Sequence, residues 1–186
     1  MNGRLYKSIV YEIGPIDRTP IEDASGWREY VTREMFARGI GVINPLDKPT
    51  ENQETEEWRD SLSRYKGLGL FHHVYDEVSD IVKEDMRFVD ISHFMIYYMD
   101  MEANPCGSWM ESMHAAAYQK KPVLTVCKQG RENMPNWWLG VNPPEFNFDS
   151  FAELIQYIDY VNDLSNDPDT LGRWKFIDMK KVYGEN

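Results

Sequence analysis

The order of apolar and polar positions along the chain predicts alternating strands and helices. Apolar runs typical of strands buried in a parallel sheet lie at residues 5–13, 41–44, 94–99 and 123–127. Apolar residues at helical spacing lie at residues 27–38, 74–88, 109–119 and 151–161. Gly39 is expected to end the first of these helices, and Asp149 or Ser150 to cap the start of the last. This alternation predicts a three-layer, flavodoxin-like (Rossmann-like) α/β fold with a mostly parallel sheet of four or five strands.

A polar stretch at residues 47–69 interrupts this alternation. It is rich in Glu, Asn and Arg, and we expect it to contain a helix near residues 54–65. Because it lacks the Gly/Ser or Pro richness of a linker, we interpret it as an insertion or a flap. The length of 186 residues fits one domain, so the prediction is a single domain over residues 1–186 that carries this insert.

Composition narrows the class of protein. The chain has 20 Lys and Arg against 31 Asp and Glu, and the resulting charge of −11 argues against nucleic-acid binding through a basic face. No apolar run approaches the ~18–20 residues of a membrane span, and the start is too polar for a signal peptide. Two cysteines, Cys106 and Cys127, are too few for a disulfide scaffold. We therefore expect a cytoplasmic protein that handles a small molecule, with no nucleic acid or membrane as partner.

Ligands of parallel α/β sheets bind beyond the carboxyl ends of the strands. That rule selects three predicted loops, at residues 14–17, 45–47 and 100–108. In the first of them, Gly14 would let the backbone approach a ligand closely, although an ordinary surface turn also uses Gly-Pro. No Cys/His cluster has metal-ligand spacing, and no glycine-rich nucleotide motif is present, so neither a metal nor a cofactor is expected.

Glu111 is the candidate nucleophile. We expect it in the first turn of the helix that follows the central strand, where the helix dipole would keep its carboxylate ionised. An ionised, positioned carboxylate can attack an electrophilic carbon. The alternative is that Glu111 only caps the helix.

Three further polar residues lie just before the central strand. Asp85 is expected at the end of a helical segment, where a negative charge is unfavourable and weakly suggests a purpose, although a solvated helix end is the alternative. His93 could pair with Asp90, but a lone histidine at a strand edge is more often structural.

Tyr11, Tyr97 and Tyr98 are expected to be ordinary core or rim aromatics, and Trp137-Trp138 to form a packed lid or a subunit contact.

Taken together, these motifs resemble the nucleoside 2-deoxyribosyltransferase-like family. The similarity lies in the order and spacing of three groups of residues over about residues 5–160. They are Gly14-Pro15-Ile16-Asp17 with Trp27-Arg28 and Gly41-Val42-Ile43-Asn44-Pro45, then Glu84-Asp85 with Val89-Asp90-Ile91-Ser92-His93, then Cys106-Gly107-Ser108-Trp109-Met110-Glu111 with Ala115 and Lys121-Pro122-Val123.

The resemblance implies glycosyl transfer at the anomeric carbon of a nucleoside. Glu111 would attack C1′ of the deoxyribose, and Asp85 would assist proton transfer at a ring nitrogen of the base. Substrate-binding residues would be Gly14, Pro15, Asp17, Asp90, His93, Asn104, Gly107, Ser108 and Asn142. The family also implies a homodimer or higher homo-oligomer in which a neighbour's loop, here residues 137–147 with Asn142, completes each site.

The sequence departs from the family pattern at several positions. His93 stands where the family commonly has an aspartate, and Asn104-Pro105 where an acidic residue often holds the sugar hydroxyls. Asn104 and Ser108 could instead help to hold a 5′-phosphate, with Arg18 or Arg28 as the cation.

Three functions therefore follow from the sequence. The first is a nucleoside 2-deoxyribosyltransferase that moves 2-deoxyribose between nucleobases through a covalent glutamyl-sugar intermediate. The second is a nucleoside or nucleoside 5′-monophosphate N-glycosidase, a hydrolase that uses the same glutamate. The third is a non-catalytic nucleotide-sensing module. The small-molecule partners would be a nucleoside or deoxynucleotide and a free nucleobase.

Overall fold

The centre of the molecule is a sheet of five parallel strands. The structure, a computed structural model, describes residues 2–16, 19–47, 55–103 and 106–178. The strands are β1 (Ile9–Ile13), β2 (Gly41–Ile43), β3 (Phe94–Met99), β4 (Val123–Cys127) and β5 (Asn147–Phe148), in the order β2-β1-β3-β4-β5. Val10 is in register with Val42 on one side and Phe94 on the other. This is the flavodoxin-like strand order, and it confirms the predicted fold.

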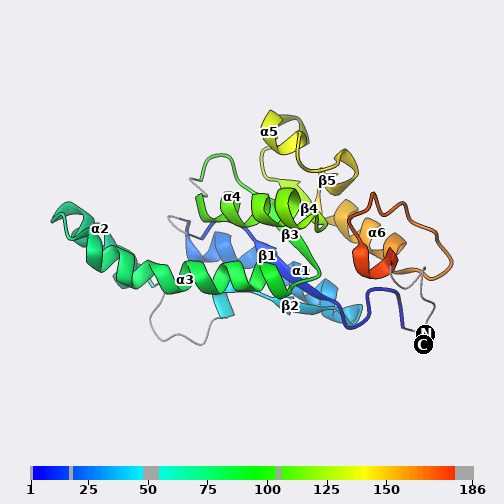
Figure 1. The fold of residues 1–186 in the computed structure, drawn as a ribbon, viewed down its shortest axis with the longest axis horizontal. Helices are drawn as coiled ribbons and strands as arrows, with labels where there is room; N and C mark the ends of the chain where they lie inside the picture. The colour runs from blue at the N-terminus through cyan, green and yellow to red at the C-terminus, as the bar shows by residue number, and fades with distance from the viewer. Residues whose placement is uncertain (1, 17–18, 48–54, 104–105, 179–186) are drawn as a thin grey trace.

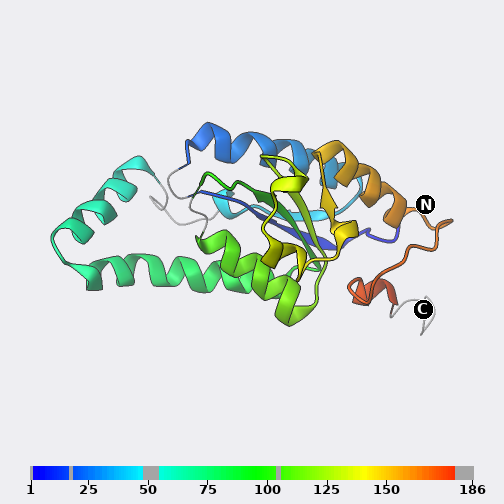
Figure 2. The ribbon, with the colours of Figure 1, turned by 90° about the horizontal axis from the view of Figure 1, so that it is seen from above.

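Helices cover both faces of the sheet and bury two apolar clusters (Figures 1 and 2). Val10, Ile96 and Leu124 point to one face and pack under α1 (Ile21–Ala37) and α6 (Phe151–Asn162). Alternate residues, such as Met95 and Tyr97, point to the other face under α3 (Phe71–Ile91) and α4 (Cys106–Met113). Because strand side chains alternate between faces, these apolar runs have to be buried on both sides.

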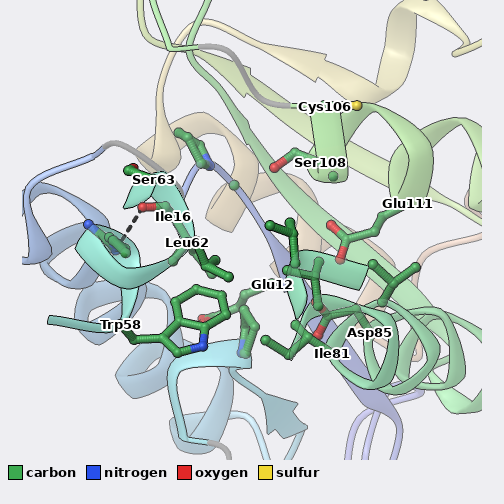
Figure 3. A pocket seen from close by; sticks show the side chains of 18 of the residues that line it. Glu12, Ile16, Trp58, Leu62, Ser63, Ile81, Asp85, Cys106, Ser108 and Glu111 are labelled. Atoms are coloured by element: carbon green, nitrogen blue, oxygen red, sulfur yellow. Dashed lines mark hydrogen bonds between the residues drawn. The ribbon is translucent and has the colours of Figure 1, made fainter. Parts of the chain in front are cut away.

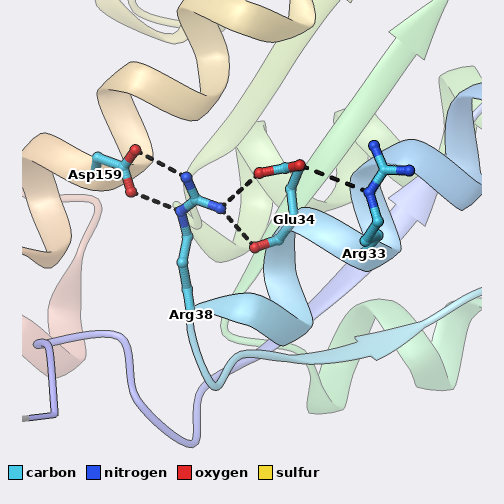
Figure 4. Close-up of polar contacts among 4 residues, drawn as sticks. All are labelled: Arg33, Glu34, Arg38 and Asp159. Atoms are coloured by element: carbon cyan, nitrogen blue, oxygen red, sulfur yellow. Dashed lines mark hydrogen bonds and ion pairs between the residues drawn. The ribbon is translucent and has the colours of Figure 1, made fainter.

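An ion pair joins the two helices of the first face (Figure 4). The guanidinium of Arg38, just after α1, donates to both carboxylate oxygens of Asp159 in α6, at 2.6 and 2.8 Å. It also donates to the carboxylate of Glu34 at 2.9 Å. These acceptors raise the pKa of Arg38 above its usual value. A two-pronged contact of this kind fixes the orientation of both partners.

The polar stretch that the sequence sets apart forms a helical hairpin with α3. Its helix α2 (Glu56–Gly67) is capped by Thr55, whose hydroxyl accepts from the Trp58 N–H at 3.2 Å. Helix α2 turns at Gly69, which has a φ of +71°, and packs against α3. The hairpin projects from the body of the molecule (Figure 1), so this segment is a helical extension rather than a linker.

Several predicted boundaries are wrong by a few residues. The first strand begins at Ile9 rather than residue 5, because the chain turns at Lys7 with a φ of 64°. Helix α1 begins at Ile21, α3 extends to Ile91, and α4 begins at Cys106. The apolar pattern misses these helix ends although Ala24 of α1 and Val89 of α3 are buried, because single apolar residues among polar neighbours do not show the helical period. Ser150 caps α6, as predicted, by accepting from the Glu153 N–H at 3.2 Å.

The remaining elements are short. They are the 3-10 helices η1 (Pro45–Asp47), η3 (Arg131–Asn133) and η4 (Pro144–Phe146), the π-helical turn η2 (His114–Gln119) that continues α4, and α5 (Asn136–Leu139). Within the residues that the structure describes, no helix combines the length and the apolar character needed to cross a membrane.

Candidate active site

A cavity of about 570 Å³ lies at the carboxyl ends of β1 and β2. This volume is in the range of sites that bind nucleoside-sized molecules. The strand ends, the start of α4 and the α2–α3 hairpin all contribute to its wall (Figure 3). The lining comprises Tyr11, Glu12, Gly14, Pro15, Ile16, Pro45, Trp58, Arg59, Asp60, Leu62, Ser63, Lys66, Val74, Val78, Ile81, Val82, Asp85, Cys106, Gly107, Ser108 and Glu111.

Glu111 points into this cavity from α4 and is held by a tyrosine. The Tyr11 hydroxyl donates to Glu111 Oε1 at 2.8 Å, and only 8% of Glu111 is exposed. Burial, followed by the negative charge of Glu111, raises the pKa of Tyr11 well above its usual value. Tyr11 therefore stays protonated and donates to the carboxylate throughout the neutral pH range. A buried carboxylate with one fixed donor is a positioned nucleophile.

The reason that the sequence gives for an ionised Glu111 is wrong. Because α4 begins at Cys106, Glu111 lies in the second turn, beyond the free N–H groups and the strongest part of the dipole. The hydrogen bond from Tyr11 on the neighbouring strand takes their place. Tyr11 is thus part of the site and not the ordinary core aromatic that was expected.

Asp85 also lines the cavity, but not from a helix end. It lies in the interior of α3, which continues to Ile91, so the argument from an unfavourable dipole does not apply. In Figure 3 its carboxyl group and that of Glu111 lie on the same side of the cavity. The two carboxyl groups predicted to carry the chemistry therefore share one cavity.

The wall opposite the strand ends comes from the hairpin and combines an apolar surface with the polar side chains of Arg59, Asp60, Ser63 and Lys66. Trp58 and Leu62 of α2 face the cavity together with Val78, Ile81 and Val82 of α3. Arg59 fastens this wall to the loop after β1, since its guanidinium donates to the carbonyls of Ile16 at 2.9 Å and Thr19 at 3.0 Å. The sequence missed these residues because the stretch reads as a polar surface segment.

The turn after β1 is closely packed beneath the cavity. A Cβ atom at Gly14 would lie 2.7 Å from the Trp27 ring, so only glycine fits there without a shift. Arg28 is buried and donates to the carbonyl of Gly14 at 3.0 Å, and its guanidinium lies over the Trp27 ring. Arg28 therefore supports the turn, whereas the sequence suggested it as a cation for a phosphate.

Glu12 is a second buried carboxyl group in the cavity lining, and it lies outside the motifs that the sequence presents. It is fully buried, and Thr32 of α1 donates to its Oε1 at 3.1 Å. Burial raises its pKa from 4.5 to about 8, although Thr32 and the charge of Arg28 act in the opposite direction. Glu12 is therefore neutral at pH 7. The available signal was a charged residue within an otherwise apolar strand, Ile-Val-Tyr-Glu-Ile.

The other predicted binding residues fall into three groups. Gly14, Pro15, Gly107 and Ser108 line the cavity. Asp17 and Asn104, together with Arg18, lie outside the described residues. The remaining three, Asp90, His93 and Asn142, are absent from the lining that the structure describes.

The structure does not bring those last three residues to the cavity. His93 precedes β3 at its amino end, and its Nδ1 accepts from the Ile9 N–H at 3.0 Å rather than pairing with Asp90. Asp90 accepts instead from Gln119. Asn142 is 1% exposed and donates to the Val123 carbonyl at 2.9 Å, so it braces its own chain.

The two adjacent tryptophans have different surroundings. Trp138 is fully buried and donates from its indole to Asn147 at 3.0 Å, whereas Trp137 is 83% exposed. Trp138 is therefore part of the core and not of a lid. Trp137 is on the surface, where a subunit contact remains a prediction. Among the described residues, no group of three or more His, Cys, Asp or Glu side chains is placed to hold a metal ion.

Comparison with known proteins places this geometry on a known fold. No protein-family model and no curated protein sequence matches the chain. A solved structure of a 2-deoxyribosyltransferase from Bacillus psychrosaccharolyticus is similar, with 16% identity and a TM-score of 0.55 over 81% of this chain and 92% of that one. The chain has the fold of a 2-deoxyribosyltransferase. A CMP N-glycosidase from Clostridium botulinum is also similar, with 13% identity and a TM-score of 0.47 over 82% of this chain and 98% of that one.

Proposed function

We propose that this protein is an enzyme that transfers 2-deoxyribose between nucleobases, with Glu111 as the nucleophile. The observation that carries the proposal is a buried Glu111 carboxylate, held by Tyr11 at 2.8 Å, in the wall of a nucleoside-sized cavity. The family resemblance of the sequence and the shared fold of a 2-deoxyribosyltransferase support it.

In the first step, a Glu111 carboxylate oxygen attacks C1′ and forms an ester with the sugar. The bond from C1′ to the base breaks, its electron pair goes to the base nitrogen, and protonated Asp85 supplies the proton to the base. In the second step, a nitrogen of the incoming base attacks C1′, and Asp85 takes up the proton that this nitrogen loses. The ester bond breaks and the Glu111 carboxylate is regenerated.

The apolar wall favours transfer over hydrolysis. Trp58, Leu62 and Ile81 offer flat and aliphatic surface to a base and little to water. A sugar ester facing such a wall would persist until a second base arrives, because water is excluded from the reacting carbon. The hydrolase and the non-catalytic sensing module remain as the alternatives that the experiment has to separate.

The decisive experiment is to trap the sugar ester. A 2-fluoro-2-deoxy nucleoside should form an ester that breaks down slowly, and mass analysis should locate it on Glu111. Glu111→Ala should lower base exchange by at least about a thousandfold while circular dichroism stays unchanged. Incubation with a deoxynucleoside and a foreign base separates the alternatives: free deoxyribose alone indicates a hydrolase, and binding without any cleavage indicates a sensor.

Asp85 needs its own test, because its role is separate from that of Glu111. Asp85→Asn should slow the release of poor leaving bases far more than that of good ones, since only the former need a proton to depart. An equal loss for all bases would contradict a role in proton transfer.

The protein acts as a homo-oligomer in this proposal, but not through Asn142. The tip of the α2–α3 hairpin exposes Leu68, Phe71 and Tyr75, each more than 60% accessible, with a wall of the cavity on the same hairpin. A second copy covering this apolar surface would fix the hairpin over the site. Light scattering should report a dimer or larger assembly, and Phe71→Glu should reduce it to monomers.

A further inference from the structure

The carboxyl group of Glu12 is a polar group in the cavity lining that the proposed mechanism does not use. It is the second-last residue of β1 and is 0% exposed. Its neighbours Tyr11 and Ile13 point to the α3–α4 face, so Glu12 points to the α1 face, where the other strand residues are apolar. A carboxyl group at such a position costs stability unless it is neutral and hydrogen-bonded, so its presence there calls for a function.

Among the residues that the structure describes, only one of its two oxygens has a hydrogen-bond partner. Oε1 accepts from the Thr32 hydroxyl at 3.1 Å, whereas Oε2 is buried without any partner among the described residues. Buried polar atoms in folded proteins nearly always have a partner, so an unsatisfied oxygen in the wall of a ligand cavity points to the ligand. Because Oε1 already accepts from Thr32, the proton of the neutral acid belongs on Oε2, which makes Oε2 a hydrogen-bond donor.

The charged groups around Glu12 keep it neutral at pH 7. Burial is the largest cause of its raised pKa, and Asp47 of η1 raises it further. Arg28 of α1 lowers the pKa, but its guanidinium donates to the Ala24 and Gly14 carbonyls. Across the cavity, the titratable side chains of Asp85 and Glu111 are carboxyl groups, and neither supplies a positive charge that would favour ionised Glu12.

Glu12 lies on the side of the cavity where we expect the base of a bound nucleoside, and not its sugar. In Figure 3, Trp58 and Glu12 are seen toward one side of the cavity and Glu111 toward the other. A sugar whose C1′ meets Glu111 would place its base toward the Trp58 side, where the flat indole can lie against a heterocycle.

We propose that Glu12 is a specificity-determining residue whose neutral carboxylic acid donates a hydrogen bond from Oε2 to an acceptor atom of the nucleobase, a ring nitrogen or a carbonyl oxygen. This inference rests on the proposed function, because it assumes that the cavity holds a nucleoside. Glu12 would select bases that present a hydrogen-bond acceptor to its Oε2, and it would reject bases of the same shape that have a C–H group in place of that acceptor.

The test compares Glu12→Gln with Glu12→Leu. Glutamine keeps a donor of similar shape that does not titrate, whereas leucine removes the donor. Wild-type kcat/KM should fall as pH rises above 8, as Glu12 ionises and ceases to donate, and should level off about 10–100-fold lower. Glu12→Gln should keep the pH 7 value within about threefold and lose that decline. Glu12→Leu should lose about 10–100-fold at pH 7, chiefly through KM.

A panel of deaza-nucleosides then identifies the acceptor atom. Replacing that ring nitrogen by C–H should weaken wild-type kcat/KM about as much as Glu12→Leu does, and the two changes together should cost little more than either alone. Equal pH profiles for wild type and Glu12→Gln, or a Glu12→Leu variant with wild-type KM, would overturn the inference.

Calorimetry with free nucleobases keeps this test separate from the proposed function. Binding of a base to the Glu111→Ala variant requires no catalysis, so Glu12→Leu in that background should weaken binding even if no sugar transfer exists. If no sugar ester forms at Glu111 but base binding still weakens in Glu12→Leu, the proposed reaction is refuted and the role of Glu12 is not. Sugar transfer with no dependence of base binding on Glu12 would refute the role of Glu12 alone.

Discussion

A single hydrogen bond from Tyr11 holds the carboxylate of Glu111 in position. Tyr11→Phe removes the donor at 2.8 Å from Glu111 but keeps the ring that packs against Phe88. We expect kcat to fall about 10–100-fold with little change in KM, because the bond orients the nucleophile rather than the substrate. The acidic limb of the pH–rate profile should move to higher pH, since the carboxylate loses a donor that favours its ionised form.

The control for this prediction is Tyr97→Phe. Tyr97 is also a buried tyrosine of the same face of the sheet, and its pKa is raised by burial, but it does not line the cavity. Equal kinetic losses in the two variants would mean that Tyr11 contributes only packing.

Glu12 makes the stability of the fold depend on pH in a defined direction. Its pKa is raised to about 8 from 4.5, so between these values the folded chain holds a proton that the unfolded chain has lost. The free energy of unfolding therefore declines as pH rises through this window, and the whole loss is present above pH 8. Relative to wild type, Glu12→Gln should gain roughly 1 kcal/mol per pH unit between pH 5 and 8. Urea denaturation at several pH values measures this difference, and parallel curves would contradict it.

The sequence could identify site residues that belong to a family motif, but not those whose roles depend on contacts with distant residues. Glu111 and Asp85 could be named because their motifs resemble a family, but the local reasons for their charge states failed once the helices had different bounds. Tyr11 and Glu12 lie on one strand, and their roles depend on Glu111 and Thr32, which are distant in the sequence. Contacts of that kind do not follow from periodicity.

At the scale of elements, Arg59 joins α2 to the loop after β1. Arg59→Ala removes two hydrogen bonds to the Ile16 and Thr19 carbonyls. We expect KM to rise about tenfold with a smaller change in kcat, because the apolar wall is no longer fastened over the cavity. The free energy of unfolding should fall by about 1–2 kcal/mol.

Arg64→Ala is the matched control for Arg59. It removes an arginine from the same helix, but Arg64 is exposed and does not line the cavity. Steady-state kinetics of both variants should separate loss of the contact from loss of a positive charge. An Arg64→Ala variant with the same rise in KM would show that charge, not fastening, is responsible.

The elements that could be predicted are those whose side chains face the core. Strands β3 and β4 match their predicted bounds because every position except Thr125 is apolar. Strand β5 was missed because it has only two residues, one of them Asn147, whose side chain accepts from Trp138. Helix α2 was expected, as part of an insertion or a flap, but not which of its residues face the cavity, because most of them are polar: Arg59, Asp60, Ser63 and Lys66 line the cavity beside Trp58 and Leu62.

At the scale of the whole molecule, the distribution of charge bears on the class of substrate. The chain carries a net charge of −11, and four of its carboxyl groups, those of Glu12, Asp60, Asp85 and Glu111, line the cavity, where Glu12 is neutral at pH 7. Among the described lining residues, the cations are Arg59, which bonds two carbonyls, and Lys66. Such a field disfavours a dianionic phosphate at the cavity, so a nucleoside should be preferred over its 5′-monophosphate.

We therefore expect kcat/KM for a 2′-deoxynucleoside to exceed that for its 5′-monophosphate by at least about tenfold at low ionic strength. Because the repulsion is electrostatic, added salt should screen it, and the ratio should shrink as the salt concentration rises from about 0.01 to 0.5 M. A steric cause would leave the ratio independent of salt. Lys66→Glu should enlarge the ratio, since it reverses a positive charge in the lining, whereas Lys83→Glu, on the exposed side of α3, should change it little. A preference for the monophosphate would mean that cations outside the described residues outweigh the carboxylates. It would then favour the alternative function, a nucleoside 5′-monophosphate N-glycosidase.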